Sequence, residues 1–166
     1  MFKVVISVKW GVMCLGDSLR RLDSKRGCYG QLFLRPCGKK VVKVFFNRES
    51  EGKTRDEIES TFNSEVSAYG KVSHHEELLQ LTPKFYGKVD VSQELGISDD
   101  YYTDLAYEME FISGRFDPIN SYFIQPYSSK HVIKLFESIG VDAIDSAATY
   151  NEIGIIQKVV DFGIKK

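Results

Sequence analysis

The stretch TRDEIESTFNSEVSAYGKV, residues 54–72, decides the fold. Thr54 followed three residues later by Glu57 is the capping-box pattern that begins a helix. Apolar side chains then recur at helical spacing, at Ile58, Phe62, Val66 and Tyr69. The sequence therefore predicts an amphipathic helix from Thr54 to Val72 with one apolar stripe facing a core.

Glu65 lies on that apolar stripe, seven residues after Ile58 and three after Phe62. A carboxylate in an apolar face costs several kcal/mol unless it is paired or hydrogen-bonded. Two interpretations stay open at this point. Either a cation meets Glu65 inside the protein, or Glu65 sits at the edge of the helix and its carboxylate reaches water.

The segments around this helix predict an α+β chain. Residues 41–46 form a strongly β-prone run in which Lys43 alternates with Val42 and Val44, so Lys43 points to the opposite face. Residues 27–34 read as a glycine turn that enters a strand. Further strands are predicted at 2–8, 83–89, 105–112, 153–156 and 159–160, and a second helix at 129–139. The other segments read as loops: 15–26 (or a short helix), 92–102 and 141–151.

Composition limits the classes of partner. A length of 166 residues with 43% hydrophobic and 27% charged residues is typical of one globular domain. A net charge of −1 gives no general attraction to nucleic acid or an anionic membrane, and no apolar run is long enough to span a bilayer. Cys14, Cys28 and Cys37 are odd in number and lack metal-ligand spacing, which favours a reducing, cytoplasmic location.

The order of these parts resembles the protein kinase superfamily, from Gly27 to Gly163. A glycine turn, a strand with a lysine, a helix with an inward glutamate, two strands, a helix, an irregular loop and Asp161-Phe162-Gly163 succeed one another. The resemblance implies a kinase-like N-terminal lobe, an antiparallel sheet plus one helix, in residues 1–114. It implies a strongly reduced C-terminal lobe in residues 115–166. The alternative that an unrelated α+β domain carries these motifs in the same order by chance stays open, because each motif alone is short.

The resemblance also implies roles for individual residues. Lys43 resembles the lysine that contacts the phosphates of ATP, Glu65 resembles its ion-pair partner, and Asp161 resembles the aspartate that binds Mg²⁺. The remaining nucleotide-binding residues that it implies lie in the glycine turn and in the hinge strand: Gly27, Tyr29, Gly30, Glu108, Met109, Glu110 and Phe111. Lys25 stands where the family has its first glycine.

The catalytic loop departs from the family pattern. The segment most similar to His-Arg-Asp is Ala143-Ile144-Asp145, and Asn151 stands one residue after the expected asparagine position, which Tyr150 occupies. By resemblance Asp145 would be the base that receives the substrate hydroxyl proton, and Asn151 would bind a second metal ion. The alternative, that both are ordinary polar loop residues, stays open.

The resemblance implies one of two functions. The first is an ATP- and Mg²⁺-dependent Ser/Thr protein kinase, which the set of Lys43, Glu65 and Asp161 favours. The second is a catalytically inactive, pseudokinase-like binding module such as a regulator, inhibitor or immunity-type protein, which the altered catalytic loop favours. Because the chain stops three residues after Gly163, we expect a protein partner to cover the reduced lobe, as in trimmed bacterial effector kinases. Secretion into a host cell is left open by the sequence.

Overall fold

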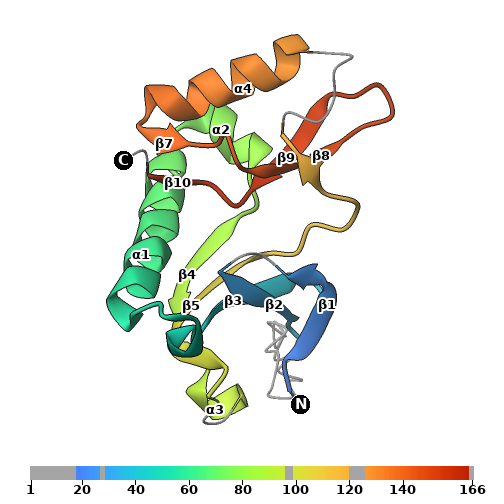
Figure 1. The fold of residues 1–166 in the computed structure, drawn as a ribbon. Helices are drawn as coiled ribbons and strands as arrows, with labels where there is room; N and C mark the ends of the chain where they lie inside the picture. The colour runs from blue at the N-terminus through green and yellow to red at the C-terminus, as the bar shows by residue number, and fades with distance from the viewer. Residues whose placement is uncertain (1–17, 27–28, 96–98, 120–125, 165–166) are drawn as a thin grey trace, which may run out of the picture.

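The main sheet has five antiparallel strands in the order β1-β2-β3-β5-β4 (Figure 1). A computed structural model describes residues 18–26, 29–95, 99–119 and 126–164 of the chain. The strands of this sheet are β1 (Arg20–Arg26), β2 (Gly30–Leu34), β3 (Lys40–Phe46), β4 (Phe85–Val89) and β5 (Tyr101–Glu110). With the four α-helices of the described ranges, this sheet makes a mixed α+β fold, as predicted.

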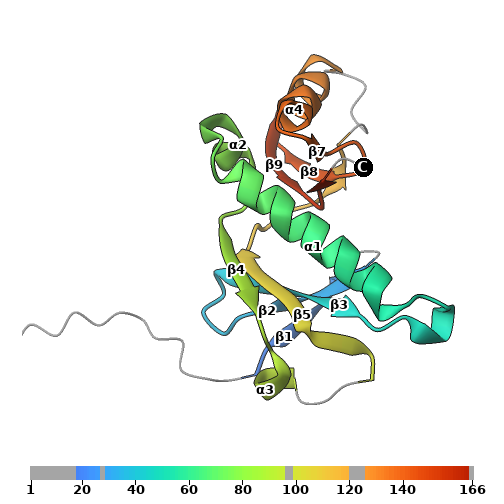
Figure 2. The same ribbon diagram turned by 90° about the vertical axis from the view of Figure 1, so that its left-hand side faces the viewer.

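Helix α1 (Arg55–Val72) packs across one face of the sheet (Figure 2). Its N-terminus carries the predicted capping box, in which Thr54 N–H donates to Glu57 Oε2 at 2.8 Å. A short 3₁₀ turn, η1 (Glu49–Glu51), precedes it. The side chains that α1 buries are Ile58, Phe62, Glu65, Ala68, Tyr69 and Val72. The helical stripe expected from the sequence is therefore confirmed, except that Val66 is only half-buried.

The opposite face of the sheet has its own small core, built from Leu19, Phe33, Val42, Val44, Val91 and Ala106. Helix α3 (Ser92–Leu95) lies against this face through Leu95. Val41 and Phe45, in contrast, face the core under α1. Strand β3 thus alternates as predicted, with Lys43 on the face opposite Val42 and Val44.

The second part of the molecule comes after β5. It holds a three-stranded sheet in the order β6-β8-β9, with β6 (Asp117–Pro118), β8 (Ala147–Tyr150) and β9 (Ile156–Val160). A strand pair, β7 (Val141–Asp142) with β10 (Gly163–Ile164), lies beside α4 (Pro126–Ser138). Helix α2 (Glu76–Leu81) packs against β9. None of the helices in the described ranges is both long and apolar enough to cross a membrane.

Several segments predicted as loops contain strands or a helix in the structure. The described part of residues 15–26 contains β1, residues 92–102 contain α3 and the start of β5, and residues 141–151 contain β7 and β8. Most of the strand expected at 153–156 is a turn, and β9 begins at Ile156. These strands form because distant partners complete their hydrogen bonds, as β10 does for β7. The strand predicted at 2–8 lies outside the described residues.

Candidate functional site

A buried ion pair joins β3 to α1 at the centre of the molecule. Lys43 Nζ lies 2.8 Å from Glu65 Oε2 and 3.1 Å from Glu65 Oε1. Lys43 is 4% exposed and Glu65 8% exposed, so neither charge is solvated by bulk water. The cation that the apolar stripe of α1 requires is therefore Lys43, and the edge-of-helix alternative is wrong.

Asp161 brings a second carboxylate to the same ammonium. Its Oδ1 lies 2.9 Å from Lys43 Nζ, and its side chain is 45% exposed, in contrast to that of Glu65. Asp161 directly succeeds β9 and has a φ of 60°, in the left-handed region that non-glycine residues rarely adopt. The next residue, Phe162, is buried with its ring centroid 4.6 Å from that of Tyr69 and 4.9 Å from that of Phe136. This anchor fixes where the Asp161 carboxylate lies.

The electrostatics keep Lys43 charged. Burial by itself lowers the pKa of Lys43, but the charges and hydrogen bonds of Glu65 and Asp161 outweigh burial and raise the pKa well above its usual value. The hydroxyl of Tyr107 donates to Glu65 Oε2 at 2.7 Å. Burial raises the pKa of Tyr107 well above its usual value, so this hydroxyl stays protonated and remains a donor.

A cavity of about 600 Å³ opens in front of Lys43 and Asp161. This volume lies within the usual range of small-molecule sites. Its lining residues come from β2, β3, the segment before β4, the end of β5 with the residues after it, β8 and β9: Gly30, Leu32, Val41, Lys43, Pro83, Met109, Glu110, Phe111, Ile112, Gly114, Arg115, Phe116, Ala147, Val160 and Asp161. The cavity therefore lies between the main sheet and the β8-β9 hairpin.

Gly30 allows β2 to pass closely over β3 at the cavity. A Cβ atom at this position would lie 2.8 Å from the backbone oxygen of Val44, nearer than such atoms approach. Of the glycine turn, Gly30 lines the cavity, whereas Tyr29 is exposed and does not. Gly27 lies outside the described residues.

The backbone after β5 forms one wall of the cavity. The N–H of Glu110 donates to Lys84 O at 2.8 Å and that of Phe111 to Lys39 O at 2.9 Å, so both donors are used. Ile112 also lines the cavity, and within the described ranges its N–H donates no hydrogen bond. Ile112 was not among the predicted site residues. Its backbone N–H is thus the group on this wall that can donate to a ligand.

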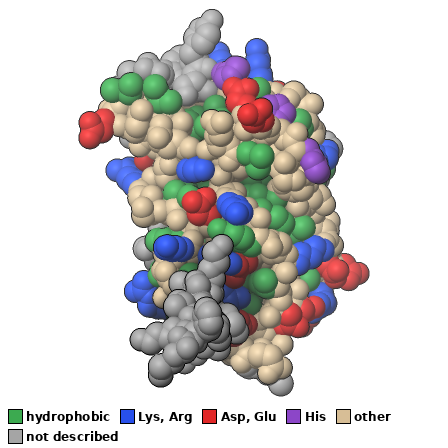
Figure 3. Space-filling view, turned by 180° about the vertical axis from the view of Figure 1, so that it is seen from behind, with side chains coloured by type: hydrophobic (Ala, Val, Ile, Leu, Met, Phe, Trp, Pro, Cys, Tyr) green, Lys and Arg blue, Asp and Glu red, His purple; other side chains and the backbone are tan. Residues whose placement is uncertain are grey.

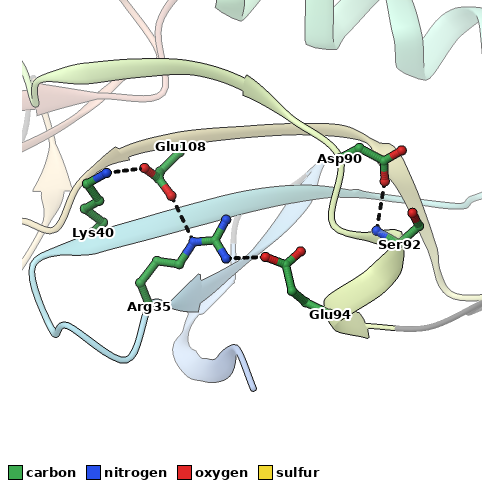
Figure 4. Close-up of polar contacts among 6 residues, drawn as sticks. All are labelled: Arg35, Lys40, Asp90, Ser92, Glu94 and Glu108. Carbon is green, nitrogen blue, oxygen red and sulfur yellow. Dashed lines mark hydrogen bonds and ion pairs between the residues drawn. The ribbon is translucent and has the colours of Figure 1, made fainter. Parts of the chain in front are cut away.

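The side chain of Glu108, one of the expected nucleotide-binding residues, points to the other side of the sheet and does not line the cavity. Its carboxylate accepts from Lys40 Nζ at 2.6 Å and from Arg35 Nε at 2.9 Å, and Arg35 also reaches Glu94 (Figure 4). Burial raises the pKa of Glu108, but the two cations outweigh burial and lower it. Strand alternation explains this placement, because neighbours of Tyr107 and Met109 must face away from them.

Neither Asp145 nor Asn151 lines the cavity. Asp145 is exposed in the turn between β7 and β8 and does not line the cavity. Asn151 Oδ1 accepts from the N–H groups of Ile153 and Ile155, which builds the β8-β9 turn. The β8 residue that lines the cavity is Ala147, paired with Val160, and Asn151 lies roughly 13 Å further along the strand direction. The described residues contain no cluster of three or more metal-ligating side chains.

One face of the molecule carries mixed charge. Figure 3 shows Lys and Arg interspersed with Asp and Glu over one face, without a broad field of either sign. This distribution agrees with the net charge of −1. Comparison with protein-family models, curated proteins and solved structures returned no match.

Proposed function

We propose that this chain is a minimal protein-kinase-like protein that binds ATP with Mg²⁺ in the cavity and transfers the γ-phosphate to a hydroxyl of a protein. One observation carries the proposal: Lys43 is held between Glu65 and Asp161 at the wall of a cavity of nucleotide size. Keeping such charges buried costs stability, and a buried charge cluster with a shifted pKa beside a cavity is typical of a functional site.

The cavity residues suit a nucleotide. Leu32, Val41, Met109 and Val160 provide apolar walls for a purine ring. The open N–H of Ile112 lies on the same wall and can pair with a ring nitrogen. Lys43 lines the same cavity, where its ammonium can meet phosphate oxygens, and Gly30 allows close approach of the β2 backbone.

Asp161 fits the requirement for Mg²⁺. This ion is usually held by one or two carboxylates together with phosphate oxygens and water. The half-exposed carboxylate of Asp161 faces the cavity, whereas Glu65 is buried behind Lys43. Bound Mg²⁺ would supply charge neutralisation on the phosphates. Asp161 would hold the ion, and Lys43 would keep Glu65 as its permanent partner.

A second candidate function, pseudokinase-like binding of a partner without phosphate transfer, is favoured by a specific observation. Asp145 and Asn151 do not line the cavity, and Ala147 occupies the β8 position beside Val160. A methyl group can neither bind a metal nor accept a proton. Transfer by the first function therefore requires the β7-β8 turn to bring Asp145 toward the cavity when a protein substrate binds.

The expected protein partner has a candidate position on the second part of the molecule, after β5. Ile144, Ile153 and Ile155 are exposed there, in the turns that flank β8. Ile153 and Ile155 share the β8-β9 turn, and apolar side chains exposed in one turn are typical of surfaces that another protein covers. We include a partner on this side in the proposal.

The nucleotide site is tested by thermal unfolding and calorimetry with ATP and Mg²⁺. At 100 times the dissociation constant, ATP should stabilise the wild type by about 2.7 kcal/mol. Lys43→Met should abolish the shift, and Asp161→Asn should remove its dependence on Mg²⁺. Lys88→Met is the matched control, because Lys88 pairs with Asn63 away from the cavity. A wild type that shows no shift at millimolar ATP with Mg²⁺ contradicts the proposal.

Transfer is separated from binding by a second measurement. Phosphate incorporation from ATP is monitored in the protein itself, in generic protein substrates and in captured partners. Under the first function Asp145→Ala abolishes incorporation while ATP still binds. Under the second, wild type incorporates nothing, and partner capture survives Lys43→Ala combined with Asp145→Ala.

A further inference from the structure

Tyr107 occupies the centre of an aromatic cluster beneath α1. It is 1% exposed, and its ring lies against those of Phe45, Phe62, Tyr69 and Phe85, with centroid separations from 5.7 to 6.4 Å. Its only polar side-chain atom is the hydroxyl, which reaches Glu65. The cluster therefore fixes the ring, and the ring fixes the direction of the hydroxyl.

The oxygens of Glu65 divide their hydrogen bonds between two elements. Oε2 accepts from Tyr107 on β5 at 2.7 Å and from Lys43 on β3 at 2.8 Å, while Oε1 accepts from Lys43 at 3.1 Å. The contact with Tyr107 is the shorter and does not depend on Lys43. The carboxylate is thus held by the sheet even when the ammonium changes its partners.

Lys43 needs such a fixed acceptor. An ammonium has three N–H donors. In the structure they serve both oxygens of Glu65 and Oδ1 of Asp161. Asp161 is the half-exposed partner and lies toward the cavity. The N–H of Lys43 that donates to Asp161 is therefore the one that a phosphate oxygen can bind instead.

We infer that Tyr107 is a positioning residue for the nucleotide site: its hydroxyl holds the Glu65 carboxylate so that Lys43 keeps one donor directed into the cavity. This inference rests on the proposed function and deepens it. Tyr107 itself does not line the cavity and acts through Glu65.

The test compares Tyr107→Phe with Tyr69→Phe. Both substitutions remove one hydroxyl from a buried ring of the same cluster. The hydroxyl of Tyr69, however, donates to Met109 Sδ at 3.4 Å and does not touch Glu65. Any difference between the two variants therefore reports the contact with Glu65, not the general loss of a buried hydroxyl.

Two readouts are measured on the full chain. The first is the rate at which acetic anhydride acylates Lys43 without nucleotide, measured by mass spectrometry, with Lys158 as internal reference because its Nζ is bound by the carbonyls of Gln80 and Thr82. The second is the dissociation constant for ATP with Mg²⁺. Tyr107→Phe should raise the acylation rate of Lys43 and the dissociation constant about five- to tenfold, since a buried charged acceptor loses a donor. Tyr69→Phe should leave both within about twofold, because no charged group loses a partner.

Equal acylation of Lys43 in the two variants overturns the inference. So does faster acylation of Lys43 and Lys158 together in Tyr107→Phe, because that result means a loosened fold. A wild type that binds no ATP contradicts the proposed function, whereas the acylation comparison still decides whether Tyr107 positions Glu65 and Lys43.

Discussion

At the scale of single residues, Lys43 and Glu65 should behave as one unit in stability. Glu65→Leu leaves the buried ammonium with only the half-exposed Asp161 carboxylate, and should lower the free energy of unfolding by about 3–5 kcal/mol. Lys43→Met combined with Glu65→Leu should cost less than Glu65→Leu alone, because the uncompensated charge is gone. Urea unfolding of the two single variants and the double variant measures this coupling.

Additivity of the two substitutions would contradict that prediction. Lys88→Met combined with Glu65→Leu is the matched control, since Lys88 contacts Asn63 and not Glu65. That pair should add within about 0.5 kcal/mol.

Local sequence patterns predict some residues of the site, whereas residues whose role depends on distant parts of the chain cannot be predicted in this way. Helical spacing alone places Glu65 inward, and the alternation of β3 places Lys43 on the facing side, so their meeting could be predicted. The same alternation on β5 turns the side chain of Glu108 outward and that of Tyr107 inward. Asn151 could not be placed, because counting residues from Asp145 does not show that its side chain builds a turn.

At the scale of elements, the capping box of α1 should give the protein a measurable dependence on acid. The backbone N–H of Thr54 donates to Glu57 and lowers the pKa of Glu57 below its usual value. A lowered folded-state pKa means that the contribution to stability is present above the unfolded-state value of about 4.5 and is lost as pH falls through the folded-state value. Glu57→Gln should therefore be less stable than wild type at pH 7, with a difference that shrinks below about pH 4.5.

Thermal unfolding from pH 7 to pH 3 checks this, with Glu152→Gln in the exposed β8-β9 turn as the control. A difference between Glu57→Gln and wild type that stays constant across this range would show that the charge of Glu57 does not stabilise the helix start.

Elements differ in how far local sequence determines them. Helix α1 carries its own start signal and an apolar stripe, and the sequence predicts it almost to the residue. The strands β7 and β8 carry no such signal, because β7 is two residues long and exists through its pairing with β10. Strand β1 is polar except for Leu22, and its hydrogen bonds to β2 define it. Such elements depend on partners that periodicity does not reveal.

At the scale of the whole molecule, the segment after β9 connects the two parts. Phe162 packs between Tyr69 of α1 and Phe136 of α4. Two residues later, the N–H of Ile164 donates to Ser64 Oγ at 2.9 Å, on the residue beside Glu65. The helix that carries Glu65 and the segment that carries Asp161 are therefore fixed to one another. The sequence supplies the order of these parts but not this contact, since about a hundred residues separate its members.

Phe162→Ala tests whether this contact holds the parts together. Phe162 is 1% exposed, and truncation of a buried phenylalanine costs about 3–5 kcal/mol through lost burial and the cavity that remains. Loss of the Phe162 ring should also leave Asp161 without a fixed position. The increase in ATP affinity that Mg²⁺ provides should therefore fall more than the part of the affinity that Lys43 provides. Ile153→Ala, at a side chain 66% exposed, is the control and should change stability by no more than about 0.5 kcal/mol.

Urea unfolding monitored by far-UV circular dichroism measures the effect of Phe162→Ala on stability, and calorimetry with ATP measures its effect on magnesium-dependent binding. If Phe162→Ala unfolds at the same urea concentration as Ile153→Ala, the ring does not join α1 to α4, and Asp161 must owe its place to the backbone of β9 and β10 alone.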